Sequence, residues 1–279
     1  MTARPADFAS GKGHRDENFP VASKLVAPAY RAPIMAFYRF ARAADDVADH
    51  PTASRDEKLD GLARMRAGLA GDGAPEAIAL AAAMAERGLD AAHANDLLNA
   101  FEQDVRVSRY PTWDAVIDYC RLSAMPVGRF VLDVHGEDRA TWPASDALCA
   151  ALQIINHLQD CGKDYRSLDR VYLPADLLAA TGAHIEELAA PVASPALRAT
   201  ITLMAARTQA LLAQSAPFAG MIRDKRLASE VAVIQRLAES LTRRLMARDP
   251  LSQRVHHGKG EAALRAAWAV ARHWMGRRG

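Results

Sequence analysis

Two short stretches of the sequence carry carboxylates at the spacing of one helical turn. The first contains Asp45, Asp46 and Asp49, with Arg42 three residues before the first of them. Residues three or four apart share one face of a helix, so Asp45 and Asp49 extend a stripe that begins with Tyr38 and Arg42. One face of this predicted helix therefore presents a phenol, a guanidinium and two carboxylates.

The second stretch lies further along the chain. Its polar residues also repeat at helical spacing, and they are Gln153, Asn156, Asp160 and Asp164. The residues between them are mostly apolar, which predicts a helix that is buried on its other sides. Burial of a carboxylate is costly unless a cation or a proton offsets the charge, and no Lys or Arg falls on this stripe. We therefore expect the stripe to meet a cation.

Hard oxygen ligands on two helices are typical of magnesium sites. Mg²⁺ binds carboxylate and phosphate oxygens and keeps several waters. Two such helices facing each other would hold a diphosphate through bridging ions, and Arg42 would add charge-assisted hydrogen bonds to it. The alternative is that each stripe is a solvated helix face. One stripe alone favours that alternative, whereas two stripes with polar companions in register favour a metal site.

The elements that must position these stripes are helices. Proline and glycine recur at short intervals, and the apolar residues between them follow the i, i+3, i+4 spacing. Ser54 before Glu57, and Thr112 before Asp114, supply start signals. No segment is typical of a sheet, so the sequence predicts an all-α fold with a single helical bundle. We expect helices over residues 33–50, 55–70, 75–87, 90–108, 112–137, 144–166, 195–215, 219–248 and 260–276, and an irregular segment over 167–194 with a short helix after Pro174.

The bulk composition agrees with a helical protein. Half of the 279 residues are apolar, which is enough for a sizeable core, and alanine, the best helix former, is abundant. We expect a single domain over residues 1–279, in which residues 1–17 are flexible and residues 254–279 form a basic C-terminal segment.

Several features bear on location and partners. The three cysteines have no metal-type spacing, and an odd number without pairing indicates a reducing compartment. Residues 1–18 are polar and lack the apolar core of a signal peptide, and no stretch reaches the roughly 18 apolar residues of a membrane span. The net charge of +2 argues neither for nor against nucleic acid, and we expect no nucleic-acid partner. Residues 254–279 are either a solvated tail or a segment attracted to anionic lipid headgroups or to a phosphorylated substrate. We expect a cytoplasmic protein with peripheral contact to the inner membrane.

The motifs together resemble the squalene/phytoene synthase family. Four family motifs occur in order along most of the chain. The family pattern Arg-x-x-Asp-x-x-x-Asp is matched by Arg42, Asp45 and Asp49, and Gln-x-x-Asn-x-x-x-Asp-x-x-x-Asp is matched by Gln153, Asn156, Asp160 and Asp164. Between them, Tyr-x-x-x-x-Ala-x-x-Val-Gly is matched by Tyr119, Ala124, Val127 and Gly128, and afterwards Arg-x-Tyr-x-Pro is matched by Arg170, Tyr172 and Pro174.

Two positions depart from the family pattern. Many members have Glu before the last Asp of each acidic motif, where this chain has Ala48 and Lys163. The number of metal ligands therefore stays open, and Lys163 either contacts substrate or points to solvent.

A finer resemblance is to the hydroxysqualene-forming members of the family from bacterial hopanoid clusters. It rests on the stretch from Glu17 to Ser23 and on the stretch from Gln159 to Pro174. The family resemblance implies an isoprenoid synthase fold around a central apolar cavity, with about three Mg²⁺ ions on the diphosphate. The subgroup resemblance implies ionisation of presqualene diphosphate, rearrangement of the cation and capture by water, giving hydroxysqualene and diphosphate without NADPH.

The residues and the resemblance together give a set of expected roles. The expected metal ligands are Asp45, Asp49, Asn156, Asp160 and Asp164. The expected substrate-binding residues are Asn18, Phe19, Ser23, Tyr38, Arg42, Gln153, Asn156, Arg170 and Lys259, and the expected catalytic residues are Tyr119, Tyr172 and Arg42. Lys259 lies between two glycines and is either a flap over the diphosphate or part of an ordinary loop.

A carbocation also needs an apolar wall with few nucleophiles. Candidates for that wall are Met125, Phe130, Val131 and Val134, with ordinary core packing as the alternative. Tyr119 and Tyr172 could hold a water or a diphosphate oxygen, or present a π-face to the cation. The alternative for each tyrosine is a core phenol with a satisfied hydroxyl.

Two other functions fit the same motifs. One is a head-to-head prenyl transferase that makes presqualene diphosphate, squalene or phytoene from two prenyl diphosphates. No glycine-rich dinucleotide motif follows a strand, which disfavours a reductive squalene synthase. The other is a non-catalytic assembly or lipid-binding protein on the same scaffold, which the four aspartates of the two stripes disfavour. As partners we expect a prenyl diphosphate substrate and neighbouring squalene-pathway enzymes that hand substrate and product on.

Overall fold

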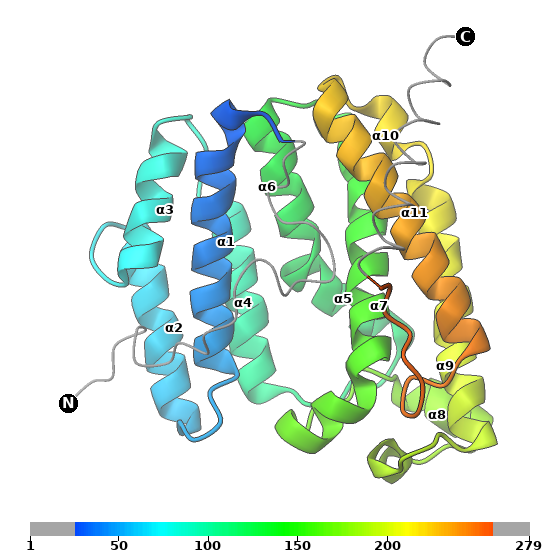
Figure 1. Cartoon of the computed structure of the whole chain (residues 1–279). Coiled ribbons are helices and arrows are strands. Elements are labelled where there is room, and N and C mark those ends of the chain that lie inside the picture. Colours follow the sequence, from blue (N-terminus) through cyan, green and yellow to red (C-terminus); the bar gives the residue numbers. More distant parts are fainter. Residues whose placement is uncertain (1–25, 259–279) are drawn as a thin grey trace, which may run out of the picture. The chain divides into compact units, whose positions relative to one another are not determined.

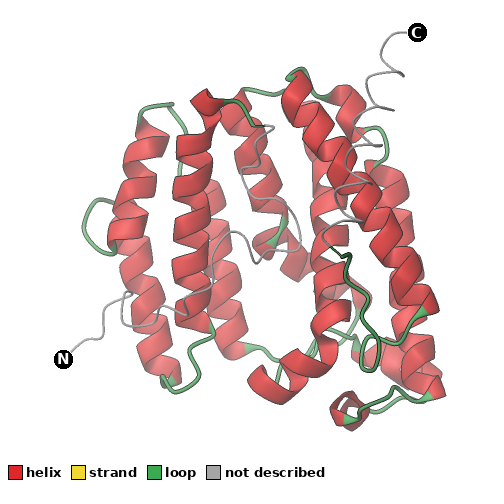
Figure 2. Ribbon diagram, in the orientation of Figure 1, coloured by secondary structure: helices red, strands yellow, loops and turns green. Residues whose placement is uncertain are grey.

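The computed structural model describes residues 26–258, and the regular elements in that range are helices (Figure 1, Figure 2). The described residues contain no β-strand, apart from an isolated bridge between Arg109 and Val171. The prediction of an all-α fold is confirmed. The helix expected over 260–276 and the flexible segment over 1–17 lie outside the described residues.

The chain divides into two compact units. In the described range, unit 1 consists of residues 26–107 and 121–137, and unit 2 consists of residues 108–120 and 138–258. Helix α5 (Trp113–Ser123) runs across the boundary between them. The expectation of a single domain over the whole chain stays a prediction.

Unit 1 is built around helix α1. It contains α1 (Pro28–Ala48), α2 (Arg55–Leu69), α3 (Pro75–Ala85), α4 (Ala92–Arg106) and α6 (Met125–His135), and α1 packs against each of the other four. The start of α2 is a capping box in which Ser54 and Glu57 satisfy each other's backbone N–H groups, as the sequence predicts.

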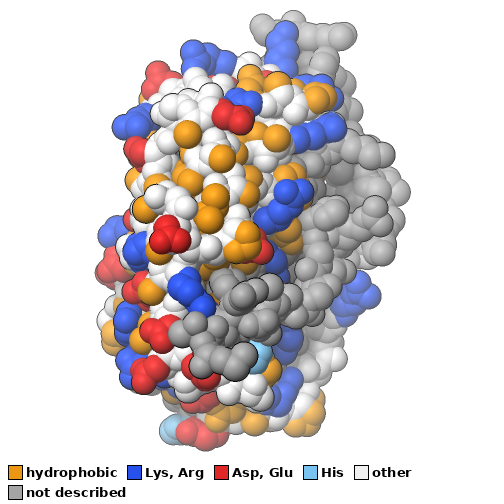
Figure 3. Space-filling view, turned by 90° about the vertical axis from the view of Figure 1, so that its left-hand side faces the viewer, with side chains coloured by type: hydrophobic (Ala, Val, Ile, Leu, Met, Phe, Trp, Pro, Cys, Tyr) orange, Lys and Arg blue, Asp and Glu red, His pale blue; other side chains and the backbone are white. Residues whose placement is uncertain are grey.

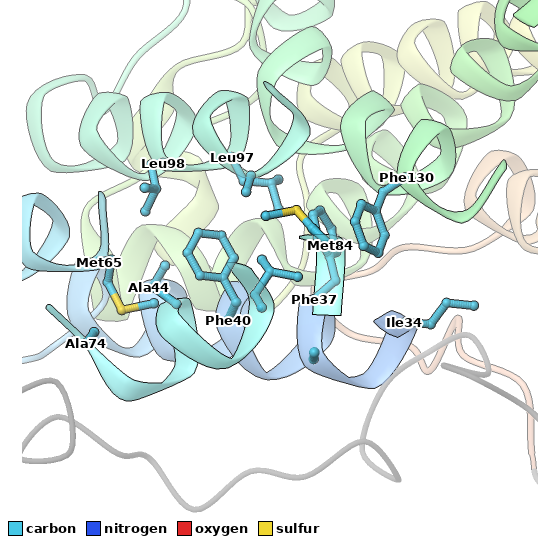
Figure 4. Close-up of a cluster of buried hydrophobic side chains, with 14 of the residues drawn as sticks. Ile34, Phe37, Phe40, Ala44, Met65, Ala74, Met84, Leu97, Leu98 and Phe130 are labelled. Atoms are coloured by element: carbon cyan, nitrogen blue, oxygen red, sulfur yellow. The ribbon is translucent and has the colours of Figure 1, made fainter. Parts of the chain in front are cut away.

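The core of unit 1 follows from the apolar spacing on α1. Phe37, Phe40, Ala44 and Val47 recur at three- and four-residue intervals and are buried. Figure 4 shows Phe37, Phe40 and Ala44 among core side chains from the other helices. The ring of Phe37 stacks on the ring of Phe130 from α6, with 4.0 Å between the ring centroids. The expected apolar-wall residue Phe130 therefore packs in the core of unit 1.

The start of α1 differs from the prediction. We expect the helix to begin at Pro33, whereas α1 begins at Pro28 and contains Pro33. A proline inside a helix has no N–H to donate, which leaves the carbonyl four residues earlier, that of Ala29, without its helical donor. The guanidinium of Arg87 donates to this carbonyl. A side chain that is remote in sequence thus compensates for the proline.

The helix predicted over residues 112–137 is wrong as a single element. It is two helices, α5 and α6, which meet at Ala124 with backbone angles φ −122° and ψ −45°. Pro126 lies in the first turn of α6, where the missing N–H has no intrahelical partner to lose. In a continuous helix over 112–137, Pro126 would lie in the interior and its ring would clash with the preceding turn. The helix is therefore interrupted just before Pro126.

Unit 2 is built around the long helix α7 (Trp142–Leu168). Its other elements are η2 (Arg139–Thr141), α8 (Ala175–Thr181), η3 (Ile185–Ala189), α9 (Pro195–Ser215), α10 (Phe218–Met221) and α11 (Lys225–Ala247). Helix α7 packs against α9 and α11, which also pack against each other. The short helix expected after Pro174 is α8, which is confirmed, and η3 adds a turn of 3₁₀ helix to the segment expected to be irregular.

The helix predicted over 219–248 is also divided. Helix α11 starts afresh at Lys225, because the Asp224 side chain accepts hydrogen bonds from the backbone N–H groups of Arg226 and Leu227. An aspartate in this position is a preferred helix N-cap. The short α10 precedes it.

The outer face of α3 is unusually poor in charge. Ile78, Ala79, Ala82 and Ala85 are exposed there. Figure 3 views the side of the molecule on which α2 and α3 lie, and hydrophobic side chains gather on it among charged ones. Within residues 26–258, no helix combines the length and the apolar character that crossing a membrane requires.

Candidate active site

The C-terminal end of α1 carries the first acidic stripe. Tyr38, Arg42, Asp45 and Asp49 are all half-buried and follow one another at four- and three-residue intervals, as the sequence predicts. The guanidinium of Arg42 contacts two carboxylates at once, with 2.8 Å to Asp45 and 2.7 Å to Asp46. Arg42 therefore orients Asp45, which belongs to the motif, and its neighbour Asp46.

The stripe concentrates negative charge. Burial, followed by the nearby charge of Asp49, raises the pKa of Asp45 to about 7; the positive charge of Arg42 opposes the rise, and Asp46 and Asp104 add smaller contributions to it. Asp104 comes from α4 and is not part of any motif that the sequence reveals. The carboxylates also lie at the negative end of the α1 dipole, and the last turn has no basic residue. The end of α1 is thus under electrostatic strain that a cation would relieve.

The second acidic stripe lies on α7. Gln153, Asn156, Asp160 and Asp164 are half-buried, while most residues around them are fully buried. The carboxylates are therefore less enclosed than the sequence pattern suggests, and the stripe is accessible along an otherwise packed helix. Lys163 is exposed.

The two stripes belong to different units, α1 to unit 1 and α7 to unit 2. The apposition of the two rows that the sequence analysis expects therefore stays a prediction. Among residues 26–258, no three His, Cys, Asp or Glu side chains are grouped so that they alone could hold a metal ion. The carboxylate and amide oxygens of both stripes are nevertheless the hard donors that Mg²⁺ prefers.

Both expected catalytic tyrosines belong to one aromatic cluster in unit 2. The ring centroids of Tyr119 and Tyr172 are 5.5 Å apart, and Tyr110 lies 5.4 Å from the first and 5.6 Å from the second. The imidazole of His157 stacks on Tyr172 with 3.5 Å between centroids. We refer to Tyr110, Tyr119, His157 and Tyr172 as the aromatic cluster.

Sequence reasoning missed two members of the aromatic cluster. Tyr110 lies just before Pro111, between two predicted helices, and is only 3% exposed. A buried tyrosine in a connection is the signal that could have identified it. His157 follows Asn156 on α7, and its position on the buried side of the helix was readable from the spacing.

Arg170 is also buried, although arginine is rarely so. Its backbone N–H donates to the carbonyl of Asp164, with 3.3 Å between the atoms. The imidazole of His157 is held in its neutral form. Burial, assisted by the positive charge of Arg170, lowers the pKa of His157 to about 3. Among the described residues the buried Nε2 of His157 has no hydrogen-bond partner. The imidazole is therefore neutral at physiological pH.

This shift predicts a pH dependence of stability. The pKa of His157 is lower in the folded protein, about 3, than its ordinary value of 6.5, so the unfolded chain binds the proton more tightly. The stabilisation is complete above pH 6.5 and is lost as the pH falls toward 3. At pH 5 we expect wild type to lose about 2 kcal/mol of unfolding free energy through this residue.

Urea unfolding of wild type and His157→Gln at pH 7 and pH 5 measures the effect. The variant should lose less stability between the two pH values than wild type does. His184→Gln, which replaces an exposed histidine of the same unit, is the control and should keep the wild-type pH dependence. Equal pH dependence in wild type and His157→Gln would contradict the assignment.

Four of the expected substrate-binding residues lie outside the described residues. They are Asn18, Phe19, Ser23 and Lys259.

The fold and the two acid-bearing helices define a class of protein, the all-α isoprenoid synthases. A model of the squalene/phytoene synthase family matches residues 13–261. The chain belongs to the squalene/phytoene synthase family.

Two curated relatives within this family are hydroxysqualene synthases. The chain is 56% identical over 270 residues to a hydroxysqualene synthase of Zymomonas mobilis, covering 95% of this chain and 91% of the relative. It is also 56% identical over 253 residues to a hydroxysqualene synthase of Rhodopseudomonas palustris, covering 90% of this chain and 87% of the relative.

Solved structures agree with the fold. The squalene synthase HpnC from Alicyclobacillus acidocaldarius superimposes with a TM-score of 0.71 at 33% identity, over 81% of this chain and 85% of that one. A dehydrosqualene synthase in complex with a ligand gives a TM-score of 0.76 at 19% identity, over 92% of each chain, and supports the fold alone.

Proposed function

We propose that this protein converts presqualene diphosphate and water to hydroxysqualene and diphosphate, using Mg²⁺ and no nicotinamide. The observation that carries the proposal is the identity of 52–56% to three hydroxysqualene synthases over 90% or more of the chain. The proposed reaction is redox-neutral, because the hydroxyl group comes from water and the leaving group departs with its bonding electrons.

The proposed metal ligands are Asp45 and Asp49 on α1 with Asn156, Asp160 and Asp164 on α7. The raised pKa of Asp45, caused first by burial and then by Asp49, supports a site that gains from a divalent cation. When bound, Mg²⁺ supplies charge neutralisation for the departing diphosphate.

Several side chains are proposed to bind the diphosphate. Arg42 orients Asp45 and Asp46 and adds positive charge next to them. Arg170 contributes a second guanidinium, while Tyr38 and Gln153 extend the two stripes. Preorganised charges of this kind stabilise the leaving group in the transition state more than in the ground state.

The aromatic cluster is proposed to face the carbocation. Aromatic π-faces attract cations without reacting with them. The pKa of His157, lowered to about 3 by burial, keeps the imidazole uncharged, so it does not repel a positive intermediate. Tyr119 and Tyr172 are proposed to hold the water that captures the rearranged cation. The proton released by that water leaves with the diphosphate.

The decisive experiment offers the purified protein either presqualene diphosphate or farnesyl diphosphate, with Mg²⁺ and without NADPH. We expect hydroxysqualene from the first substrate only, and no product when a chelator removes the metal. Consumption of farnesyl diphosphate would instead identify a head-to-head prenyl transferase. Absence of diphosphate release from either substrate would contradict an enzymatic role.

Membrane contact is proposed on separate grounds. The proposed substrate and product are both oily, so peripheral association and direct exchange with neighbouring squalene-pathway enzymes would spare them from water. The basic C-terminal segment would bind anionic headgroups. Cosedimentation with phosphatidylglycerol vesicles that falls with added salt is expected, and salt-independent or absent cosedimentation would contradict it.

A further inference from the structure

The turn that follows α7 has an unusual backbone conformation. Among residues 26–258, Asp169 is the non-glycine residue with a positive φ, 51° with ψ 37°. Side chains disfavour this left-handed region, which aspartate and asparagine tolerate better than most residues. The turn ends α7 shortly after Asp164 and starts the segment that carries Arg170 and Tyr172. A local strain is thus placed between two groups of proposed site residues.

One guanidinium holds both the backbone and the side chain of Asp169. Arg109 donates to the carbonyl of Asp169, and its Nη2 lies 2.5 Å from the carboxylate Oδ1. It also donates to the carbonyl of Ser108 at 2.9 Å, and it lies over the ring of Tyr165. We call this pair of residues the Arg109–Asp169 latch.

Backbone pairing extends the latch. The N–H of Val171 donates to the carbonyl of Ser108 at 2.9 Å, and the N–H of Ala175 donates to the carbonyl of Tyr110 at 3.0 Å. The chain from Ser108 to Tyr110 therefore runs parallel to the chain from Val171 onward. Side chains alternate along extended backbone, so Arg170 and Tyr172 lie on the side opposite to Val171. Both are more than nine-tenths buried.

The Arg109–Asp169 latch fixes the conformation of the turn but adds little to the free energy of folding. The side chain of Asp169 is 75% exposed and that of Arg109 is 35% exposed. Ion pairs this open contribute little to the free energy of folding. A strained turn held by an exposed ion pair is nevertheless well suited to fix where the next residues point.

We propose that Arg109 and Asp169 are positioning residues. They fix the positions of the Arg170 and Tyr172 side chains relative to Asp164, as diphosphate release requires. This inference rests on the proposed function, because that function places Arg170 and Tyr172 at the substrate. Neither latch residue touches substrate. Opening the latch leaves the helices of unit 2 in place and lets the two buried side chains drift.

Two variants open the latch in different ways. Arg109→Gln removes the guanidinium and leaves the strained turn. Asp169→Gly removes the carboxylate but makes a positive φ easy, so this variant should fold even where the first does not. Arg109→Lys keeps the charge without the forked donors and should restore activity only in part. Arg236→Gln breaks the ion pair with Glu239 on α11, in which the arginine is 40% exposed, and serves as the control.

Hydrogen exchange and kinetics are measured on each variant with Mg²⁺. We expect the amides of Val171 and Ala175 to exchange about tenfold faster in Arg109→Gln and Asp169→Gly. We expect kcat/KM to fall by on the order of tenfold to a hundredfold, because small misplacements of orienting groups carry large kinetic penalties. The melting temperature should stay close to wild type. Arg236→Gln should match wild type in all three measurements.

Two outcomes would overturn the proposal. One is faster exchange at Val171 with wild-type kcat/KM, which would show that an open latch still supports chemistry. The other is unchanged exchange in both variants. Variants are compared with wild type on whichever prenyl diphosphate wild type ionises, so a wrong substrate assignment does not mask the result. Hydrogen exchange without substrate tests the latch independently of the proposed function.

Discussion

Replacing Asp45 or Asp160 with asparagine should slow diphosphate release by on the order of a thousandfold. Each change keeps the shape of the side chain but removes the charge of a proposed metal ligand from one of the two stripes. Loss of one ligand weakens the neutralisation on which departure of the diphosphate depends. A coupled assay of pyrophosphate release at saturating Mg²⁺ measures the effect.

Asp45→Asn should also change the thermal stability of the metal-free protein. Burial and the charge of Asp49 raise the pKa of Asp45 from 3.8 to about 7, so the metal-free protein loses stability as the pH rises through this range, and the loss is complete above about pH 7. At pH 8 the variant should therefore melt at a higher temperature than wild type when Mg²⁺ is absent. A gain in stability together with a loss of activity is typical of residues kept for function.

Asp60→Asn is the matched control for both changes. Asp60 is exposed on α2, and its replacement should leave both pyrophosphate release and melting temperature unchanged. Near-normal turnover of Asp45→Asn or Asp160→Asn would remove the corresponding stripe from the proposed metal site. A lowered melting temperature of metal-free Asp45→Asn would contradict the electrostatic account of α1.

Phe40→Ala should lower the unfolding free energy by about 4 kcal/mol. Phe40 has no exposed surface and lies among the side chains that α1 shares with the other helices of unit 1 (Figure 4). Truncation removes the transfer free energy of the ring and leaves a cavity that rigid helices cannot close. Urea unfolding followed by circular dichroism measures the loss.

Ile78→Ala tests whether burial causes that loss. Ile78 is 39% exposed on the outer face of α3, so its truncation should cost less than about 1 kcal/mol. Similar losses in the two variants would mean that α1 is less central to unit 1 than its packing indicates.

Much of the fold could be predicted because local rules decide it. The spacing of Phe37, Phe40 and Ala44 predicts both the helix and its buried face. Ser54 and Glu57 predict where α2 starts, and Pro174 predicts α8. These signals act within one or two turns, so one sequence is enough to read them.

The errors arise where distant residues override local preference. Pro33 is a poor residue for a helix interior, and α1 accommodates it because Arg87 reaches the carbonyl that the proline leaves open. The opposite happens near Pro126, where the apolar pattern continues across a break between α5 and α6. Neither outcome follows from spacing alone.

Only part of the candidate site could be predicted from the sequence, again because distant residues contribute to it. The acidic stripes follow from helical spacing, and Tyr119 and Tyr172 follow from motifs. Asp104, by contrast, influences Asp45 only because α4 packs on α1. Arg109 acts on Asp169 from 60 residues away. Such neighbours come from tertiary packing, and no single motif carries them.

The two units of this chain are interleaved. Residues 108–120 join unit 2 before residues 121–137 return to complete unit 1. During synthesis, α1 leaves the ribosome before α6 does. The ring of Phe37 therefore stays exposed to solvent until Phe130 has emerged and can stack on it. The end of α1 that carries the proposed metal ligands therefore lies on a helix whose apolar face is covered only late in synthesis, once α6 has emerged.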